Sequence, residues 1–65
     1  MEQLTSRQRE IIKLLSKGYS NKKIGDKLGI AVGTVKQHMH RIFFIMKVKS
    51  RFSLITKVNA SMRVK

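Results

Sequence analysis

The chain has 65 residues and a formal net charge of +12 at pH 7, because 15 lysines and arginines face only three acids. A chain of this length forms one domain, which buries only about 60% of the surface that the unfolded chain exposes. It has no cysteine, which excludes disulfides and thiolate metal sites. No apolar run approaches the roughly 20 residues of a membrane span, and the polar N-terminus does not fit a signal peptide. We therefore expect a soluble intracellular domain without a large catalytic cleft.

The charge is distributed unevenly along the chain. The acids are Glu2, Glu10 and Asp26, and no acid follows Asp26. An excess of positive charge destabilises the compact state by self-repulsion, so a polyanionic partner is its simplest explanation. Nucleic acid is the first candidate partner and an anionic membrane surface the second. A basic domain that is merely soluble is the remaining alternative.

The spacing of apolar residues predicts an all-α fold. They recur at intervals of three and four rather than in alternation, which is the helical period. We expect four helices, over about residues 6–17, 21–28, 32–46 and 51–61. A short turn that contains Gly29 joins the second helix to the third. This is the helix-turn-helix arrangement, whose second helix enters the DNA major groove.

Capping residues and apolar stripes support these bounds. Thr5 and Gln8 fit a capping box, Ser20 and Ser50 are N-cap candidates, and Gly18 suits the end of the first helix. The stripes that should face the core consist of Ile11, Leu14, Leu15, Ile24, Leu28, Val35, Met39, Ile42, Met46, Leu54, Ile55, Val58 and Met62.

The third predicted helix carries the stretch GTVKQHMHRI, residues 33–42. Its apolar residues share one face, which leaves Lys36, Gln37 and His40 on the polar side. Lysine can donate to the acceptors of guanine, and glutamine can pair with the edge of adenine. The same three residues could form an ordinary solvated face. The lack of acids and the helix-turn-helix spacing favour the reading of base edges.

The two histidines do not fit a metal site. His38 and His40 lie two positions apart, about 200° around a helix, whereas paired ligands need one face and the i, i+4 spacing. We therefore expect no metal and no other cofactor. His38 adjoins the apolar stripe and should be a half-buried packing residue whose ring is hydrogen-bonded. No acid lies close in sequence to either histidine, and the serines and threonines cluster at helix starts, so we expect no enzyme.

Four motifs resemble the LuxR/FixJ-type helix-turn-helix domain. L-T-x-R-x-R-E-I, G-x-S-N-K-x-I, L-G-I-x-x-G-T-V-K-x-H and V-K-S-R occur in this order at the spacing of that family. The resemblance covers Leu4 to about Ala60. It implies a four-helix DNA-binding domain of a bacterial transcription regulator over residues 4–62, with residues 63–65 as a frayed tail. It also implies a cytoplasmic, nucleoid-associated location.

The resemblance also assigns roles to individual positions. It implies a homodimer that reads inverted half-sites of double-stranded DNA, with the third helix in the major groove. Lys36, Gln37 and His40 match positions that face bases. Positions near the phosphate backbone are matched by Ser20, Asn21, Lys22, Thr34, Arg41, Lys49, Ser50 and Arg51. The expected dimer interface on the fourth helix consists of Ile55, Val58, Asn59 and Met62.

The chain departs from the family pattern at several helix ends. Ala31 stands where the family usually has a capping Ser or Thr, at a cost of about 1 kcal/mol. Lys23 replaces the acid of a second capping box. Gly25 replaces the usual Ala inside the second helix, a change that costs roughly 1 kcal/mol in helix propensity. Lys47 replaces the Gly that usually ends the third helix, so we expect that end to be strained or extended.

Phe44 and Ile45 are apolar where the family tends to be basic or polar. Helix geometry does not allow both to face the core. Single apolar residues on a surface are common, which is the plain interpretation. The sharper hypothesis is an additional partner surface, for RNA polymerase or for an upstream domain.

Three other interpretations compete with the LuxR-type domain. The promoter-recognition domain of a sigma factor has a similar helical pattern, but the V-K-S-R motif and the helix after it favour the LuxR type. A cationic membrane-surface protein needs one long amphipathic helix, which the four glycines interrupt. A basic protein-interaction module without sequence readout would lack any preference among DNA sequences.

Overall fold

The computed structural model describes residues 3–63, and the side chains of residues 3–60. It contains α1 (Ser6–Ser16), α2 (Asn21–Leu28), α3 (Val32–Met46) and α4 (Arg51–Arg63). No strand occurs in the described part, which confirms the all-α prediction, and the bounds differ from the expected ones by two residues at most. Arg63 of the expected tail is the last residue of α4, and residues 64–65 lie outside the described residues. No helix within residues 3–63 is long and apolar enough to cross a membrane.

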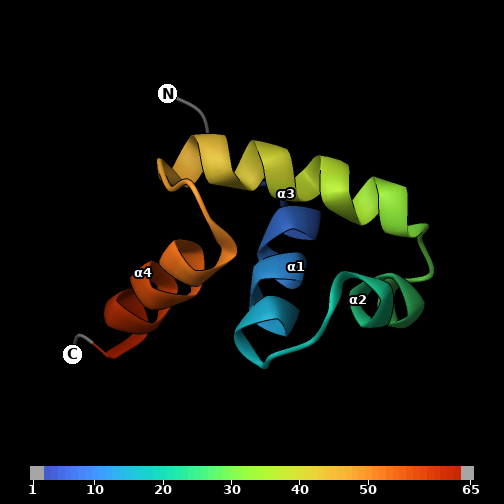
Figure 1. Ribbon diagram of the computed structural model, residues 1–65, viewed down its shortest axis with the longest axis horizontal. Coiled ribbons are helices and arrows are strands. Elements are labelled where there is room, and N and C mark those ends of the chain that lie inside the picture. The colour runs from blue at the N-terminus through green and yellow to red at the C-terminus, as the bar shows by residue number, and fades with distance from the viewer. Residues whose placement is uncertain (1–2, 64–65) are drawn as a thin grey trace.

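The first helix is the centre of the bundle. α1 contacts each of the other three helices, and α3 also packs against α2. Figure 1 shows α3 across one end of α1, with α2 and α4 on opposite sides of it. The principal dimensions are 33 × 25 × 20 Å, so every helix lies at the surface along part of its length.

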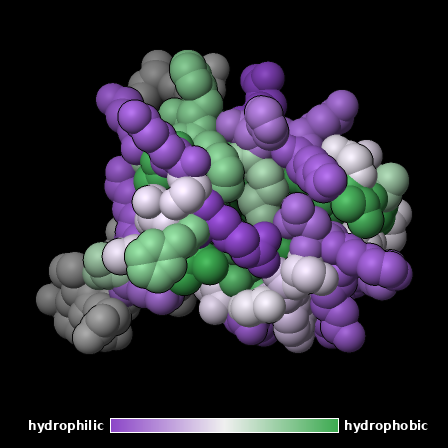
Figure 2. Space-filling model, viewed as in Figure 1, coloured by the Kyte–Doolittle hydropathy of each residue, from purple (hydrophilic) through white to green (hydrophobic). Residues whose placement is uncertain are grey.

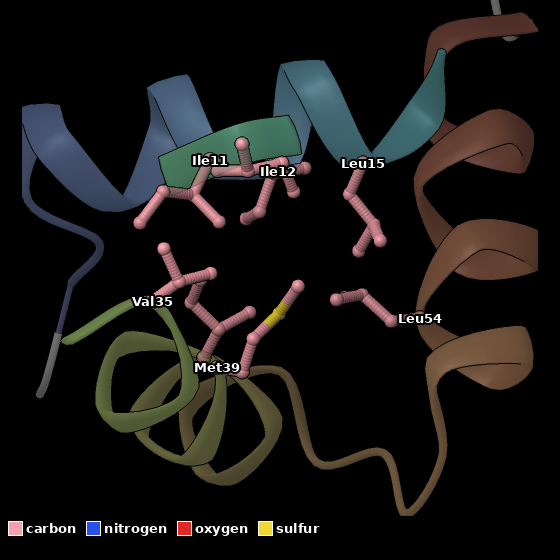
Figure 3. Packing of buried hydrophobic residues seen from close by; sticks show 8 residues of the cluster. Ile11, Ile12, Leu15, Val35, Met39 and Leu54 are labelled. Carbon is pink, nitrogen blue, oxygen red and sulfur yellow. The ribbon is translucent and has the colours of Figure 1, made fainter. Parts of the chain in front are cut away.

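All four helices contribute to the core, which Figure 3 shows from close by. Predicted positions such as Leu14 and Met46 are only half-buried at the margin of the core, whereas Ile12, which the stripe did not include, is 8% exposed. The side chain of Met62 lies outside the described residues. Among the described residues, the buried apolar side chains are Ile11, Ile12, Leu15, Ile24, Val35, Met39, Ile42 and Leu54.

The three predicted N-caps are present, at α1, α2 and α4. The Oγ1 of Thr5 accepts from the Gln8 N–H at 3.1 Å, and the Thr5 N–H donates to the Oε1 of Gln8 at 2.9 Å. The Oγ of Ser20 accepts from the Lys23 N–H at 3.1 Å. Ser50 caps α4 in the same way. Ala31 heads α3 and supplies no side-chain cap, as its identity predicts.

The first three helices end in the same backbone motif. Each has a left-handed residue just after its last turn: Gly18 (φ 90°), Gly29 (φ 71°) and Lys47 (φ 58°). The following residue donates its N–H to the carbonyl five positions earlier: Tyr19 to Leu14, Ile30 to Gly25 and Val48 to Phe43. This is the Schellman pattern, which favours glycine. α3 therefore ends in a strained residue and is not extended.

The glycine inside α2 has a steric role that its helix propensity does not reveal. Gly25 is buried, and a Cβ atom added to it would lie 2.6 Å from the carbonyl oxygen of Ile30. That carbonyl belongs to the turn that leads into α3. Gly25 therefore allows the turn to pass close to α2 and α3 to begin close behind it. The cost in helix propensity that the sequence predicts is only one part of the contribution of Gly25 to stability.

We expect Lys47→Gly to stabilise the domain by about 0.5–1 kcal/mol. Glycine removes the strain of the left-handed backbone, and the greater conformational entropy of glycine in the unfolded chain offsets part of this stabilisation. Thermal and urea unfolding measure this change. Lys49→Gly is the matched control, since it removes the same charge from the same loop but lies outside the left-handed region. It should be neutral or destabilising, and an equal gain in both variants would contradict the strain at Lys47.

Candidate nucleic-acid interface

The residues buried on the inner face of α3 determine which residues its outer face exposes. Val35, Met39 and Ile42 are buried, so residues on the opposite side of the helix point away from the core. Lys36, Gln37, His40 and Arg41 are exposed and line one concavity of about 510 Å³. The structure thus brings together the three residues expected to read base edges and adds an arginine. This set offers several donors and two groups that can also accept hydrogen bonds.

A second basic region joins two distant segments. The Nη1 of Arg51 donates to the Oδ1 of Asn21 at 3.2 Å, and its Nη2 donates to the Tyr19 carbonyl. The guanidinium therefore ties the start of α4 to the start of α2, across 30 positions of sequence. Arg51 and Asn21 were both expected near phosphates. Their observed bonds give them a structural role at the junction of these helices.

The start of α2 has a strongly positive electrostatic environment. Lys22 and Lys23 are exposed in its first turn, and none of the four described helices has an acid there. Cations at a helix N-terminus add to the positive end of the dipole instead of opposing it. The ion pair of Lys22 with Asp26, at 3.7 Å, is exposed on both sides and contributes little. The region is therefore suited to bind an anion.

The other predicted phosphate positions have mixed surroundings. Lys49 is exposed in the loop before α4, and Thr34 is half-buried in α3. The hydroxyl of Ser50 accepts from the Ser53 N–H and donates to the Oγ of Ser53, both at 3.0 Å. Ser50 is therefore used as a cap, while Lys49 is free to face a ligand.

The expected dimer residues divide into two kinds. Ile55 and Val58 are half-buried and pack against the core, so part of each side chain is used within the protein. Asn59 is exposed, and the side chain of Met62 lies outside the described residues.

The structure also shows the surroundings of His38 and of the exposed phenylalanines. His38 is half-buried as expected, but its ring has no hydrogen bond to a described residue. Within the described chain, no group of three or more His, Cys, Asp or Glu side chains could hold a metal ion. Phe44 is 75% exposed and Ile45 is half-buried. Phe52 is 79% exposed, and its exposure was not predicted. Its position outside the apolar stripe of α4 would have indicated it.

Comparison with sequence families shows to which family this chain belongs. The profile of the bacterial regulatory proteins of the luxR family matches residues 2–58. The chain belongs to the LuxR family. This confirms the resemblance carried by the four motifs. LuxR-type domains are DNA-binding domains of transcription regulators and not enzymes, which agrees with the expectation that this chain catalyses no reaction.

Individual relatives of this LuxR-family domain are bacterial regulators. The putative HTH-type transcriptional regulator YhjB of Escherichia coli K12 is 41% identical over 61 residues, 94% of this chain and 30% of its own. The nitrate/nitrite response regulator NarL of the same strain is 45% identical over 51 residues, 78% of this chain and 24% of its own. The oxygen regulatory protein NreC of Staphylococcus carnosus is 40% identical over 52 residues, 80% of this chain and 24% of its own.

One solved structure agrees with the fold. The response regulator ChrA of a heme-sensing two-component system superposes with a TM-score of 0.88 at 31% identity, over 98% of this chain and 32% of that one. The LuxR-family domain described here therefore spans about a third or less of the length of the proteins it matches.

The Arg51 junction predicts a measurable stability effect. We expect Arg51→Lys to lower the free energy of unfolding by about 1–2 kcal/mol, because lysine keeps the charge but cannot reach two acceptors in the geometry of a guanidinium. Chemical unfolding measures the loss. Arg41→Lys is the matched control, since Arg41 is exposed on α3, and an equal loss there would contradict a specific role for the Arg51 bonds.

Proposed function

We propose that this LuxR-family domain binds double-stranded DNA in a sequence-dependent way, with α3 in the major groove. The observation that carries the proposal is that Lys36, Gln37, His40 and Arg41 line one concavity on the outer face of α3. α3 has 15 residues and a length of about 22 Å. A major groove about 12 Å wide admits such a helix, and base edges there present the donors and acceptors that these side chains complement.

Phosphate contacts would come from other parts of the domain. We propose that the starts of α2 and α4, with Lys22 and Lys49, hold the phosphate backbone. Their contribution is independent of sequence and falls with salt, because each neutralised phosphate releases counterions. Arg51 would contribute indirectly, because its hydrogen bonds hold the start of α4 beside the start of α2.

We also propose that two copies, each with α3 in one of two inverted half-sites, contact each other through α4. Exposed Asn59 and the outer parts of Ile55 and Val58 are the surface for this contact. A net charge of +12 on each copy opposes association in free solution, and DNA phosphates remove that repulsion. The dimer would therefore form on DNA. Residues 4–62 would be the folded unit that does so, at the nucleoid, and Phe44 remains a candidate contact for RNA polymerase.

Selection from a randomised duplex library at physiological salt tests this proposal. We expect the domain to enrich an inverted repeat, and Lys36→Ala to lose about 1–3 kcal/mol of preference at one position of each half-site. Binding that is uniform over all sequences and disappears with salt would show a basic module without readout. An equal loss of Lys36→Ala on every duplex would contradict a base contact of this residue.

Lys22→Ala is the matched control, because it removes the same charge from a position assigned to phosphate. It should weaken binding to all duplexes alike and reduce the salt slope by about one unit. The selected motif should stay unchanged. A slope equal to that of the unsubstituted domain would contradict the phosphate contact of Lys22.

A further inference from the structure

A second concavity lies between α1, α4 and the C-terminal end of α3. It measures about 540 Å³ and shares no lining residue with the concavity on α3. Its apolar lining consists of Leu4, Ile12, Met46 and Val58, which come from three helices and the segment before α1. We name it the α1–α4 groove. In Figure 2 hydrophilic and hydrophobic side chains are interleaved over one face of the molecule, and part of the hydrophobic surface lies near α4 and the C-terminal part of α3.

One wall of the α1–α4 groove carries a row of positive charges. Arg9, Lys13 and Lys17 are exposed, line the groove, and follow one another at intervals of four along α1 and its C-cap. Residues four apart are neighbours on a helix surface, so like charges in this row repel one another. No acid among the described residues lines the groove. The row is therefore a site where negative charge from a partner would be stabilising.

The wall also contains a polar atom without a partner. The Oγ of Ser16 is buried and makes no hydrogen bond within the described part of the chain. Ser16 lines the α1–α4 groove beside the basic row. A buried hydroxyl without a partner is unfavourable, and a rotation of the side chain would let it bond to a group that enters the groove.

We propose that the α1–α4 groove binds an acidic amphipathic helix of a partner protein. Apolar side chains of that helix, spaced i, i+3 and i+7, would occupy the apolar lining, and its carboxylates would pair with Arg9, Lys13 and Lys17. In the absence of DNA, a second copy of this chain is a poor occupant, because it brings +12 to a basic wall. DNA is a poor occupant as well, because its phosphates cannot fill an apolar lining. The groove lies apart from the face of α3 but shares Val58 and Asn59 with the surface proposed for the dimer contact. A bound partner would therefore leave α3 free for DNA and compete with dimerisation through α4.

Fluorescence anisotropy with a labelled synthetic peptide of about 16 residues tests the proposal. The peptide contains Leu at the stated spacing and Glu and Ala elsewhere, and the DNA-free domain is titrated into it. We expect saturable binding, and about tenfold weaker binding to the triple variant Arg9→Gln/Lys13→Gln/Lys17→Gln. A peptide of the same composition, with its Leu residues scattered around the helix, should bind the unsubstituted domain more weakly, because it cannot fill the apolar lining.

Lys22→Gln/Lys23→Gln/Lys36→Gln is the matched control, because it removes the same charge from exposed positions outside the groove. It should keep the affinity for the peptide and lose affinity for DNA, whereas the groove variant should keep its preference among DNA sequences. Equal loss of peptide binding in both variants would overturn the proposal, because it would show attraction by net charge alone. Self-association that the groove variant strengthens, without peptide binding, would assign the groove to a second copy.

NMR shift mapping locates the bound peptide directly. The proposal expects the largest amide shift changes at Lys13, Ser16 and Val58. Changes confined to Lys36, Gln37 and His40 would place the peptide on the face of α3 and overturn the assignment of the groove. Neither result depends on DNA, so a failure here is distinguishable from a failure of the proposed DNA recognition.

Discussion

The burial of one face of α3 is the constraint on which the rest of the molecule depends. Val35 and Ile42 are fully buried and Met39 nearly so, against a core to which the other three helices contribute. Rotation of α3 by one residue, about 100°, would carry Lys36 toward that core. An unpaired lysine is too costly to bury. The same packing that stabilises the domain therefore fixes Lys36, Gln37 and His40 on the outside.

Several local features lower stability where DNA contact is proposed. Ala31 leaves the start of α3 without a side-chain cap, and Lys22 and Lys23 place positive charge at the start of α2. Each such feature costs about 0.3–1 kcal/mol. A ligand that binds only the folded state offsets costs of this kind, in proportion to its affinity. A domain with a small core and a net charge of +12 is thus expected to be more stable on a polyanion than alone.

The sequence predicted best what depends on neighbours along the chain. Helix bounds and the capping box of Thr5 and Gln8 follow from residues within a few positions. The strain at Lys47, one of the two outcomes expected there, does so too. The exposed set on α3 was predicted equally well, because one helical period determines it. These features need no knowledge of how the helices pack.

The features that were missed depend on packing between distant segments. The bond of Arg51 to Asn21 joins residues 30 positions apart and leaves no periodic signal. The burial of Ile12 depends on the breadth of the core around α1, which touches all three other helices. The steric need for Gly25 appears only when the turn at Ile30 is in place. The α1–α4 groove likewise exists only where three helices meet.

We expect the outer face of α3 to be the surface that contacts DNA, because burial of the inner face leaves it as the exposed side of the helix. A titration of the 15N-labelled domain with a selected duplex, followed by NMR, tests it most directly. We expect the largest amide shift changes along residues 36–41, accompanied by changes at the starts of α2 and α4. Maximal changes along Arg9, Lys13 and Lys17, with α3 unaffected, would contradict it.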